Sequence, residues 1–139
     1  MSQWQHSPKL VDRWLRALDL PHQVSIEERE LRLVDSRGQT PVTFASVGTG
    51  VGQVLPILIA GLTSQRKTIA VEQPELHLHP SQQGHVADFI IDGVTSRNQQ
   101  WLVESHSEAI ISRVLRRIRE KKLRPEQVSV LYVEPGPEG

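Results

Sequence analysis

The sequence predicts an α/β domain built on a mostly parallel sheet with flanking helices. Beyond residue 44, amphipathic segments alternate with short apolar runs in the order helix, strand, helix, strand, helix, strand. This order is typical of parallel sheets with helical crossovers. Aromatic residues are 4% of the composition and hydrophobic residues 37%, so the expected core is aliphatic. At 139 residues, the chain is long enough to bury the core of one domain.

The first expected element is a helix that ends near Leu20 and Pro21. Ser7 is a suitable N-cap, and Pro8 suits the first helical position. Apolar residues then recur at helical spacing, namely Leu10, Val11, Trp14, Leu15 and Leu18.

A small antiparallel hairpin is expected next, over residues 24–44. Leu31 and Leu33 alternate with Arg32, which is the period of a half-buried strand, and residues 36–39 are typical of a turn.

The glycine-rich stretch 46–53 opens an apolar segment to Leu62, expected to be a helix with Pro56 in its first turn. Strands are expected at 68–71, 101–103 and 128–133, and helices after Pro80 and over 107–122. The apolar run at 68–71 predicts a strand buried on both faces.

Composition excludes several classes of protein. The 16 basic and 16 acidic side chains balance, which argues against a chain wrapped in nucleic acid. Without cysteine there is no disulfide, thiolate zinc site or cysteine nucleophile. No apolar run reaches the roughly 20 residues of a membrane span, and the first residues do not resemble a secretory signal. A cytoplasmic location is therefore expected.

Glu72, Gln73 and Glu75 follow the expected strand at 68–71. An acid at a buried strand end is costly unless it meets a cation or hydrogen-bond donors. In a phosphate-handling site such a carboxylate holds Mg²⁺, usually through water, and a neighbouring acid or amide orients the attacking water. The alternative is an acid in a solvated loop.

His77 and His79 would point the same way in an extended chain, so a metal site is one interpretation, with Glu72, Glu104 or His106 as further ligands. The alternative is a pair of neutral histidines in a polar loop that ends at Pro80.

His106 lies between the expected strand at 101–103 and a helix start. Helix amino termini bind anions through free N–H groups, and a histidine there can donate to a phosphate. The alternative is that Ser107 is an N-cap with Glu108 in the first turn.

Gly48, Gly50 and Gly52 allow close approach of the backbone to a phosphate before a helix. Glycine-rich turns are nevertheless common. The stretch is also not a P-loop, because the chain contains no Gly-Lys dipeptide and so no GxxxxGKS/T motif.

A basic helix face is expected near the carboxyl end. It is made of Arg113, Arg116, Arg117, Arg119, Lys121, Lys122 and Arg124. It is interpreted as a solvated helix face, with nucleic-acid binding as the alternative.

Taken in order, SVGTGVGQVLP, TIAVEQPELHLHPSQQ and LVESHSE resemble the carboxyl-terminal half of an ABC-type ATPase head. The branch looks like the predicted AAA ATPases related to SMC, RecF and overcoming-lysogenization-defect proteins. The resemblance runs from about Trp14 to Val133 and implies a partial P-loop NTPase fold, with 1–139 as one carboxyl-terminal lobe.

The resemblance also implies site roles. The signature motif, which reaches the γ-phosphate of an opposing protomer, corresponds to Ser46, Gly48, Gly50 and Gln53. Glu72 takes the Walker B magnesium position, and the next position, normally the catalytic glutamate, is Gln73. The D-loop region contains His77, His79 and Pro80, and His106 matches the switch histidine.

Two departures limit what the resemblance implies. Gln73 orients a water but accepts no proton at neutral pH, so either Glu75 substitutes for the base or hydrolysis is slow. The Walker A lysine belongs to a lobe that these residues do not include, and phosphoryl transfer relies on that lysine and Mg²⁺. ATP and Mg²⁺ are expected in a complete protein, and the isolated chain is expected to be inactive.

The leading hypothesis is thus an ATPase lobe that meets a P-loop-bearing lobe or a second copy of itself, since an exposed sheet edge invites association. A non-enzymatic module that binds DNA or protein and a metal-dependent hydrolase using His77, His79 and Glu72 are the alternatives.

Overall fold

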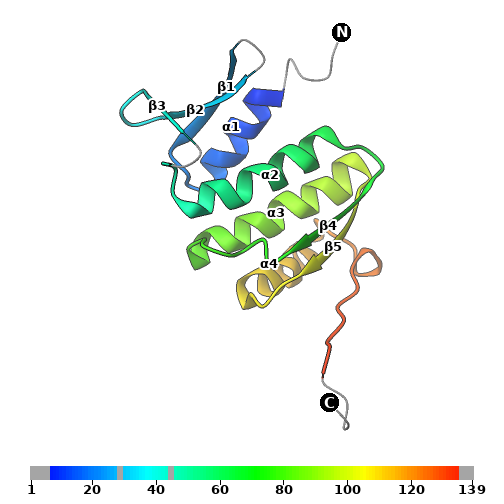
Figure 1. Ribbon diagram of the computed structural model, residues 1–139. Coiled ribbons are helices and arrows are strands. Elements are labelled where there is room, and N and C mark those ends of the chain that lie inside the picture. Colours follow the sequence, from blue (N-terminus) through cyan, green and yellow to red (C-terminus); the bar gives the residue numbers. More distant parts are fainter. Residues whose placement is uncertain (1–6, 28–29, 44–45, 135–139) are drawn as a thin grey trace.

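The computed structural model describes residues 7–27, 30–43 and 46–134. Its elements are α1 (Ser7–Ala17), β1 (His22–Glu27), β2 (Glu30–Asp35), β3 (Thr40–Val42), α2 (Thr49–Thr63), β4 (Thr68–Glu72), α3 (Pro80–Arg97), β5 (Gln100–Glu104), α4 (Glu108–Arg119) and a 3-10 turn at Pro125–Gln127. Helices α2 and α3 lie between a small sheet with α1 on one side and β4, β5 and α4 on the other (Figure 1). The predicted α/β class is confirmed.

An antiparallel sheet in the order β1, β2, β3 packs beside α1. The expected hairpin is therefore present, with one strand more than predicted, because residues 24–34 divide into two paired strands. The backbone N–H of Val24 donates to the Asp12 carboxylate at 2.7 Å, which ties β1 to α1. Leu15 and Leu33 are both fully buried, so this unit shares the main core.

The centre of the core is Phe89 on α3, which has no exposed surface. Its ring meets Trp14 edge-on at 5.0 Å between centroids and Trp101 at 5.9 Å, which joins α1, α3 and β5. A Cβ at Gly61 on α2 would lie 2.6 Å from the Phe89 ring. Glycine there permits the close approach of α2 to that ring.

Strands β4 and β5 form a two-stranded parallel sheet whose register runs from Thr68 opposite Gln100 to Glu72 opposite Glu104. The predicted burial of the first strand on both faces is wrong. Ile69 is half-buried while Ala70 is exposed, and Leu102 on β5 is 57% exposed. Burial alternates along β4, as expected for a strand covered on one face, and α2 and α3 are helices that contact these strands.

The strand expected at 128–133 is also absent, because residues 128–134 form no regular secondary structure. Val130, Leu131, Tyr132 and Val133 are all exposed. A strand needs a neighbouring ladder for its backbone groups, and none of the described strands pairs with this segment. The parallel sheet of the described residues is correspondingly smaller than expected.

Pro56 lies inside α2 rather than in its first turn, which corrects the predicted helix start. Proline removes the backbone bond to the carbonyl four residues earlier, here that of Gly52. The buried side chains Val54, Leu55 and Leu58 on either side hold the helix together by packing. Among the described residues no helix is both long and apolar enough to cross a membrane.

Candidate functional site

The carboxyl ends of β4 and β5 bring two acids together. Glu72 and Glu104 are the last residues of their strands and are register partners, so they lie side by side at one edge of the sheet. Both side chains are exposed. The backbone N–H of Gln73 donates to the Glu104 carbonyl at 2.8 Å, which extends the pairing by one residue. This edge is where open parallel sheets bind ligands.

The amino terminus of α2 contacts the segment that leaves β4. Gly48 is the N-cap and contributes no side-chain cap, so first-turn N–H groups of α2 are free of side-chain partners. A Cβ on Gly50 would lie 2.9 Å from the carbonyl oxygen of His77, whereas a Cβ on Gly52 would meet nothing within 4 Å. The close approach therefore depends on Gly50.

Ser46, just before α2, closes a local turn with Thr43. Its hydroxyl accepts from the Thr43 N–H at 3.0 Å and donates to the Thr43 carbonyl at 2.9 Å. Gln53 follows in α2 and is half-buried. The predicted signature residues thus lie on the loop before α2 and on its first two turns, and Gly50 is the one whose close approach to His77 is seen.

Residues 74–77 form a turn between β4 and α3, with left-handed backbone at Gln73 (φ 45°) and His77 (φ 59°). The extended geometry on which the histidine metal interpretation rests is therefore wrong. His79 is instead the N-cap of α3, and its ring accepts from the Ser81 N–H. The described residues contain no group of three or more metal-binding side chains.

Glu75, within this turn, is 8% exposed and reaches the next loop. Its Oε1 accepts from the Ser105 hydroxyl at 2.9 Å and from the His106 backbone N–H at 2.8 Å. The histidine side chain itself is exposed. The turn after β4 and the loop after β5 are therefore joined through one buried carboxyl.

Ser107 is the N-cap of α4, as the capping alternative predicts, because its hydroxyl accepts from the Ile110 N–H. The same hydroxyl donates to the Gln83 side chain at 2.6 Å, and Gln83 donates to the Leu78 carbonyl at 3.1 Å. Sequence reasoning missed these contacts of Gln83 and those of Ser105. No spacing rule links residues 24 to 30 positions apart, so only the fold pairs them.

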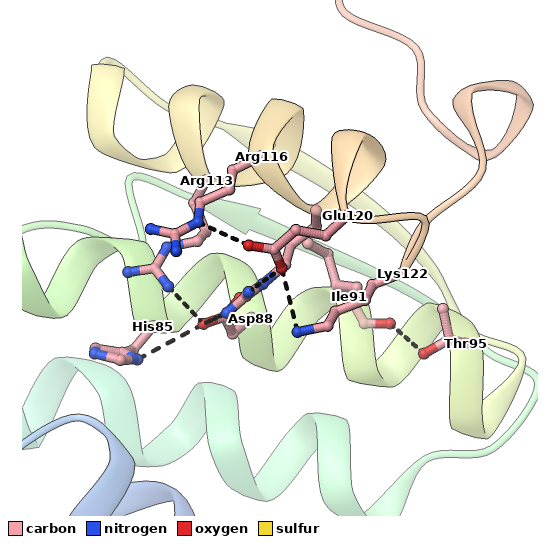
Figure 2. Close-up of polar contacts among 9 residues, drawn as sticks. His85, Asp88, Ile91, Thr95, Arg113, Arg116, Glu120 and Lys122 are labelled. Atoms are coloured by element: carbon pink, nitrogen blue, oxygen red, sulfur yellow. Dashed lines mark hydrogen bonds and ion pairs between the residues drawn. The ribbon is translucent and has the colours of Figure 1, made fainter.

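Four residues of the predicted basic face pair with acids, namely Arg113, Arg116, Arg117 and Lys122, and Figure 2 shows the cluster that they form around Asp88 and Glu120. Helix α4 itself ends at Arg119, so Lys121, Lys122 and Arg124 lie beyond it. Arg117 binds Asp88 on α3 with both carboxylate oxygens, at 2.6 and 2.8 Å, and Arg113 contacts the same group at 3.2 Å. Arg116, Arg117 and Lys122 surround Glu120 and lower its pKa to about 2. These contacts favour a structural role for much of this face, and nucleic-acid binding there stays a prediction.

A groove of about 370 Å³ lies between α1, α3 and α4. Its lining includes Trp14, His85 and Asp88. Arg117 and Lys122 of the basic face also line it, whereas none of the residues of the ATPase-like motifs does. The edge of the sheet where β4 and β5 end at Glu72 and Glu104, called the motif edge below, is thus separate from this groove.

Comparison with known proteins gives a family and a fold. The profile described as the AAA ATPase domain matches residues 8–111. A solved chain from work on ATP-driven dimerization and DNA-stimulated activation of SMC ATPases is similar at 13% identity and a TM-score of 0.58, covering 78% of this chain and 72% of that one. The SMC head domain from Thermotoga maritima is similar at 10% identity and a TM-score of 0.54, covering 80% of this chain and 41% of that one.

No curated protein matches the chain. The structural similarity, at these low identities, shows a shared fold with SMC ATPase heads, and the chain spans less than half of the Thermotoga head domain. The profile match, by contrast, extends over more than half of this sequence. The chain therefore belongs to the AAA ATPase domain family.

Proposed function

We propose that this chain is the carboxyl-terminal lobe of an ATPase head similar to those of SMC, RecF and overcoming-lysogenization-defect proteins, and that it supplies half of a composite nucleotide site. One observation carries the proposal. The amino terminus of α2, the end of β4 and the loop after β5 meet at one edge of the molecule. Family membership and the SMC-like fold support it.

The residues at this edge have the chemistry that the proposal needs. Glu72, with Glu104 beside it, offers carboxylate oxygens, the ligands that Mg²⁺ prefers, so these residues fit a magnesium ion held largely through water. Bound Mg²⁺ would neutralise charge on the transferred phosphoryl group. The backbone N–H groups of Thr49 and Gly50, which have no partner among the described residues, suit a phosphate presented by the opposing lobe. His106 is exposed at the same edge.

Gln73 sets the expected rate of hydrolysis. Its amide can orient a water but cannot accept its proton at neutral pH. Glu75 is buried and already accepts two hydrogen bonds on Oε1, which makes it a poor substitute base. Slow hydrolysis is therefore the expectation, and Gln73→Glu, which restores a carboxylate, is expected to raise the turnover rate.

The second half of the site must come from another lobe. The sequence contains no P-loop, and the motif edge lies outside the groove described above. Among the described strands, β4 and β5 pair only with each other, so each offers one open edge for association. The partner that completes the site is a P-loop-bearing lobe, because a second copy of this chain would also lack the P-loop. A second copy is instead a candidate for pairing at the open edge of the sheet.

The first experiment compares the 139-residue chain alone with the chain joined to a lobe that contains GxxxxGKS/T. Titration calorimetry is expected to show no micromolar binding of Mg-ATP to the chain alone. The joined protein is expected to turn over ATP. In it, Glu72→Gln is expected to abolish Mg²⁺-dependent turnover, and His106→Ala to lower kcat more than nucleotide affinity.

The matched control is Glu126→Ala, an exposed acid of the 3-10 turn far along the chain from the motif edge. It is expected to leave turnover unchanged. Micromolar Mg-ATP binding by the chain alone would contradict the composite site. Equal turnover in the Glu72 and His106 variants and the parent would contradict the residue roles.

A further inference from the structure

The loop that contains His106 is held by a residue on a different loop. Ser105, His106 and Ser107 connect β5 to α4, and the backbone N–H of His106 donates to Oε1 of Glu75 at 2.8 Å. The Ser105 hydroxyl donates to the same oxygen at 2.9 Å. Hydrogen bonds to a carboxylate are roughly twice as strong as neutral ones. The backbone at His106 is therefore fixed from outside its own loop.

The carboxyl of Glu75 is suited to this task and poorly suited to proton transfer. The residue is 92% buried, and within the described part of the chain Oε2 has no hydrogen-bond partner. Among the described residues, the hydrogen bonds of the carboxyl group thus all pass through Oε1 to residues 105 and 106. A general base needs an oxygen that is open to the reacting water. Here Oε1 is occupied and Oε2 is buried.

Two neighbouring sets of hydrogen bonds also link the segment after β4 to the segment after β5. Gln83 on α3 accepts from the Ser107 hydroxyl at 2.6 Å and donates to the Leu78 carbonyl at 3.1 Å. The Gln73 N–H pairs with the Glu104 carbonyl at 2.8 Å. The turn after β4 and the loop after β5 are therefore joined at three points, of which the contact of Glu75 is the one that reaches His106.

We propose that Glu75 is a positioning residue that fixes the backbone of His106 and so places its imidazole at the nucleotide edge. The inference rests on the proposed function, because the proposed nucleotide site provides the phosphate that His106 would contact. It assigns Glu75 a role different from that of a general base. Any movement of the turn after β4 is transmitted through this carboxyl to His106.

Three substitutions of Glu75 distinguish the length of its side chain, its negative charge and its ability to accept a proton. Glu75→Gln keeps the acceptor oxygen in place but cannot act as a base. Glu75→Asp keeps the charge but is one methylene too short to reach the His106 N–H. Glu75→Ala removes both properties. The exposed Glu126→Ala is the matched control for loss of an acid.

The first readout is amide hydrogen exchange at His106 in the full 139-residue chain, which requires no nucleotide. Glu75→Asp and Glu75→Ala are expected to speed exchange at least about tenfold, the equivalent of one hydrogen bond to a charged group. Glu75→Gln is expected to stay within about threefold of the parent, since a neutral acceptor is weaker. If Glu75→Ala does not fold, the Asp and Gln pair decides the result.

The second readout is ATP turnover by the joined protein. Glu75→Gln is expected to keep most of kcat, whereas Glu75→Asp lowers it about tenfold with a smaller change in KM. Turnover as low in Glu75→Gln as in Glu75→Ala, or parent-like exchange in Glu75→Asp, would overturn the positioning role. A parent protein without any turnover would instead contradict the proposed function, and the exchange result would still decide the contact.

Discussion

Gly50→Ala tests whether the glycine-rich stretch is built for contact with the turn after β4. A Cβ at this position would lie 2.9 Å from the His77 carbonyl oxygen and 3.1 Å from a methyl group of Leu78. Backbone atoms cannot rotate away as a side chain does, so either α2 or the turn must shift. Gly52→Ala is the matched control, because a Cβ there meets nothing within 4 Å.

The magnitude follows from two opposing effects. Replacing glycine by alanine at an unstrained position stabilises a protein by about 0.4–1 kcal/mol. Gly52→Ala should show this gain. Overpacking a close contact costs about 1–3 kcal/mol, so Gly50→Ala should be less stable than Gly52→Ala by about that amount. The helix effect cancels in the comparison, and what remains is the cost of the close contact alone.

Urea unfolding measures the free energies of unfolding of both variants and the parent. For a domain of this size, each kcal/mol corresponds to about 3 °C in Tm, so thermal unfolding gives an independent measurement. In the joined ATPase, Gly50→Ala should also lower turnover, since the start of α2 moves relative to the nucleotide edge. A Gly50→Ala protein as stable as Gly52→Ala would refute the contact argument.

Three further predictions concern packing and charge. Phe89→Ala should lower the free energy of unfolding by about 3–5 kcal/mol, and the exposed Leu115→Ala should lower it by less than about 0.5 kcal/mol. Urea unfolding measures both. Similar losses in the two variants would contradict the central place of Phe89 in the core. Asp88→Ala should cost about 1.5–3 kcal/mol, because two part-buried guanidinium groups lose their carboxylate, and Asp88→Asn should recover part of the loss in the same assay. The pKa of Glu120 is lowered from 4.5 to about 2 by Arg116, Arg117 and Lys122. The ionised Glu120 therefore stabilises the fold fully above about pH 4.5, and this contribution is lost as the pH falls to about 2. In Glu120→Gln, the free energy of unfolding should fall less steeply with pH over that range. The same pH dependence in the variant and the parent would contradict the ion pairs of Glu120.

Local patterns predicted most of the elements. The helical spacing of Val11 and Leu15 marks α1, the alternation around Leu33 marks a strand, and Pro80 marks the start of α3. These patterns work because the periods of helices and strands place apolar residues on one face. They also placed Glu72 and Glu104 at strand ends, where the parallel register then brings them together.

Other features depended on neighbours that a local pattern does not contain. The apolar run at 128–133 has the composition of a strand but pairs with none of the described strands. Likewise, His79 looks like a ligand in sequence, yet its ring caps α3 because the turn before it is left-handed at His77.

What the sequence determined by itself is the place of most helices and strands, the absence of a P-loop and the placement of acids and glycines near strand ends. Only the tertiary structure decided that Glu75 is buried against the His106 backbone, that Gly50 meets the His77 carbonyl and that Asp88 binds the arginines of α4. The physical reason is distance along the chain. Periodicity and capping act over a few residues, whereas these contacts join residues 25 to 31 positions apart and exist only once the core has formed.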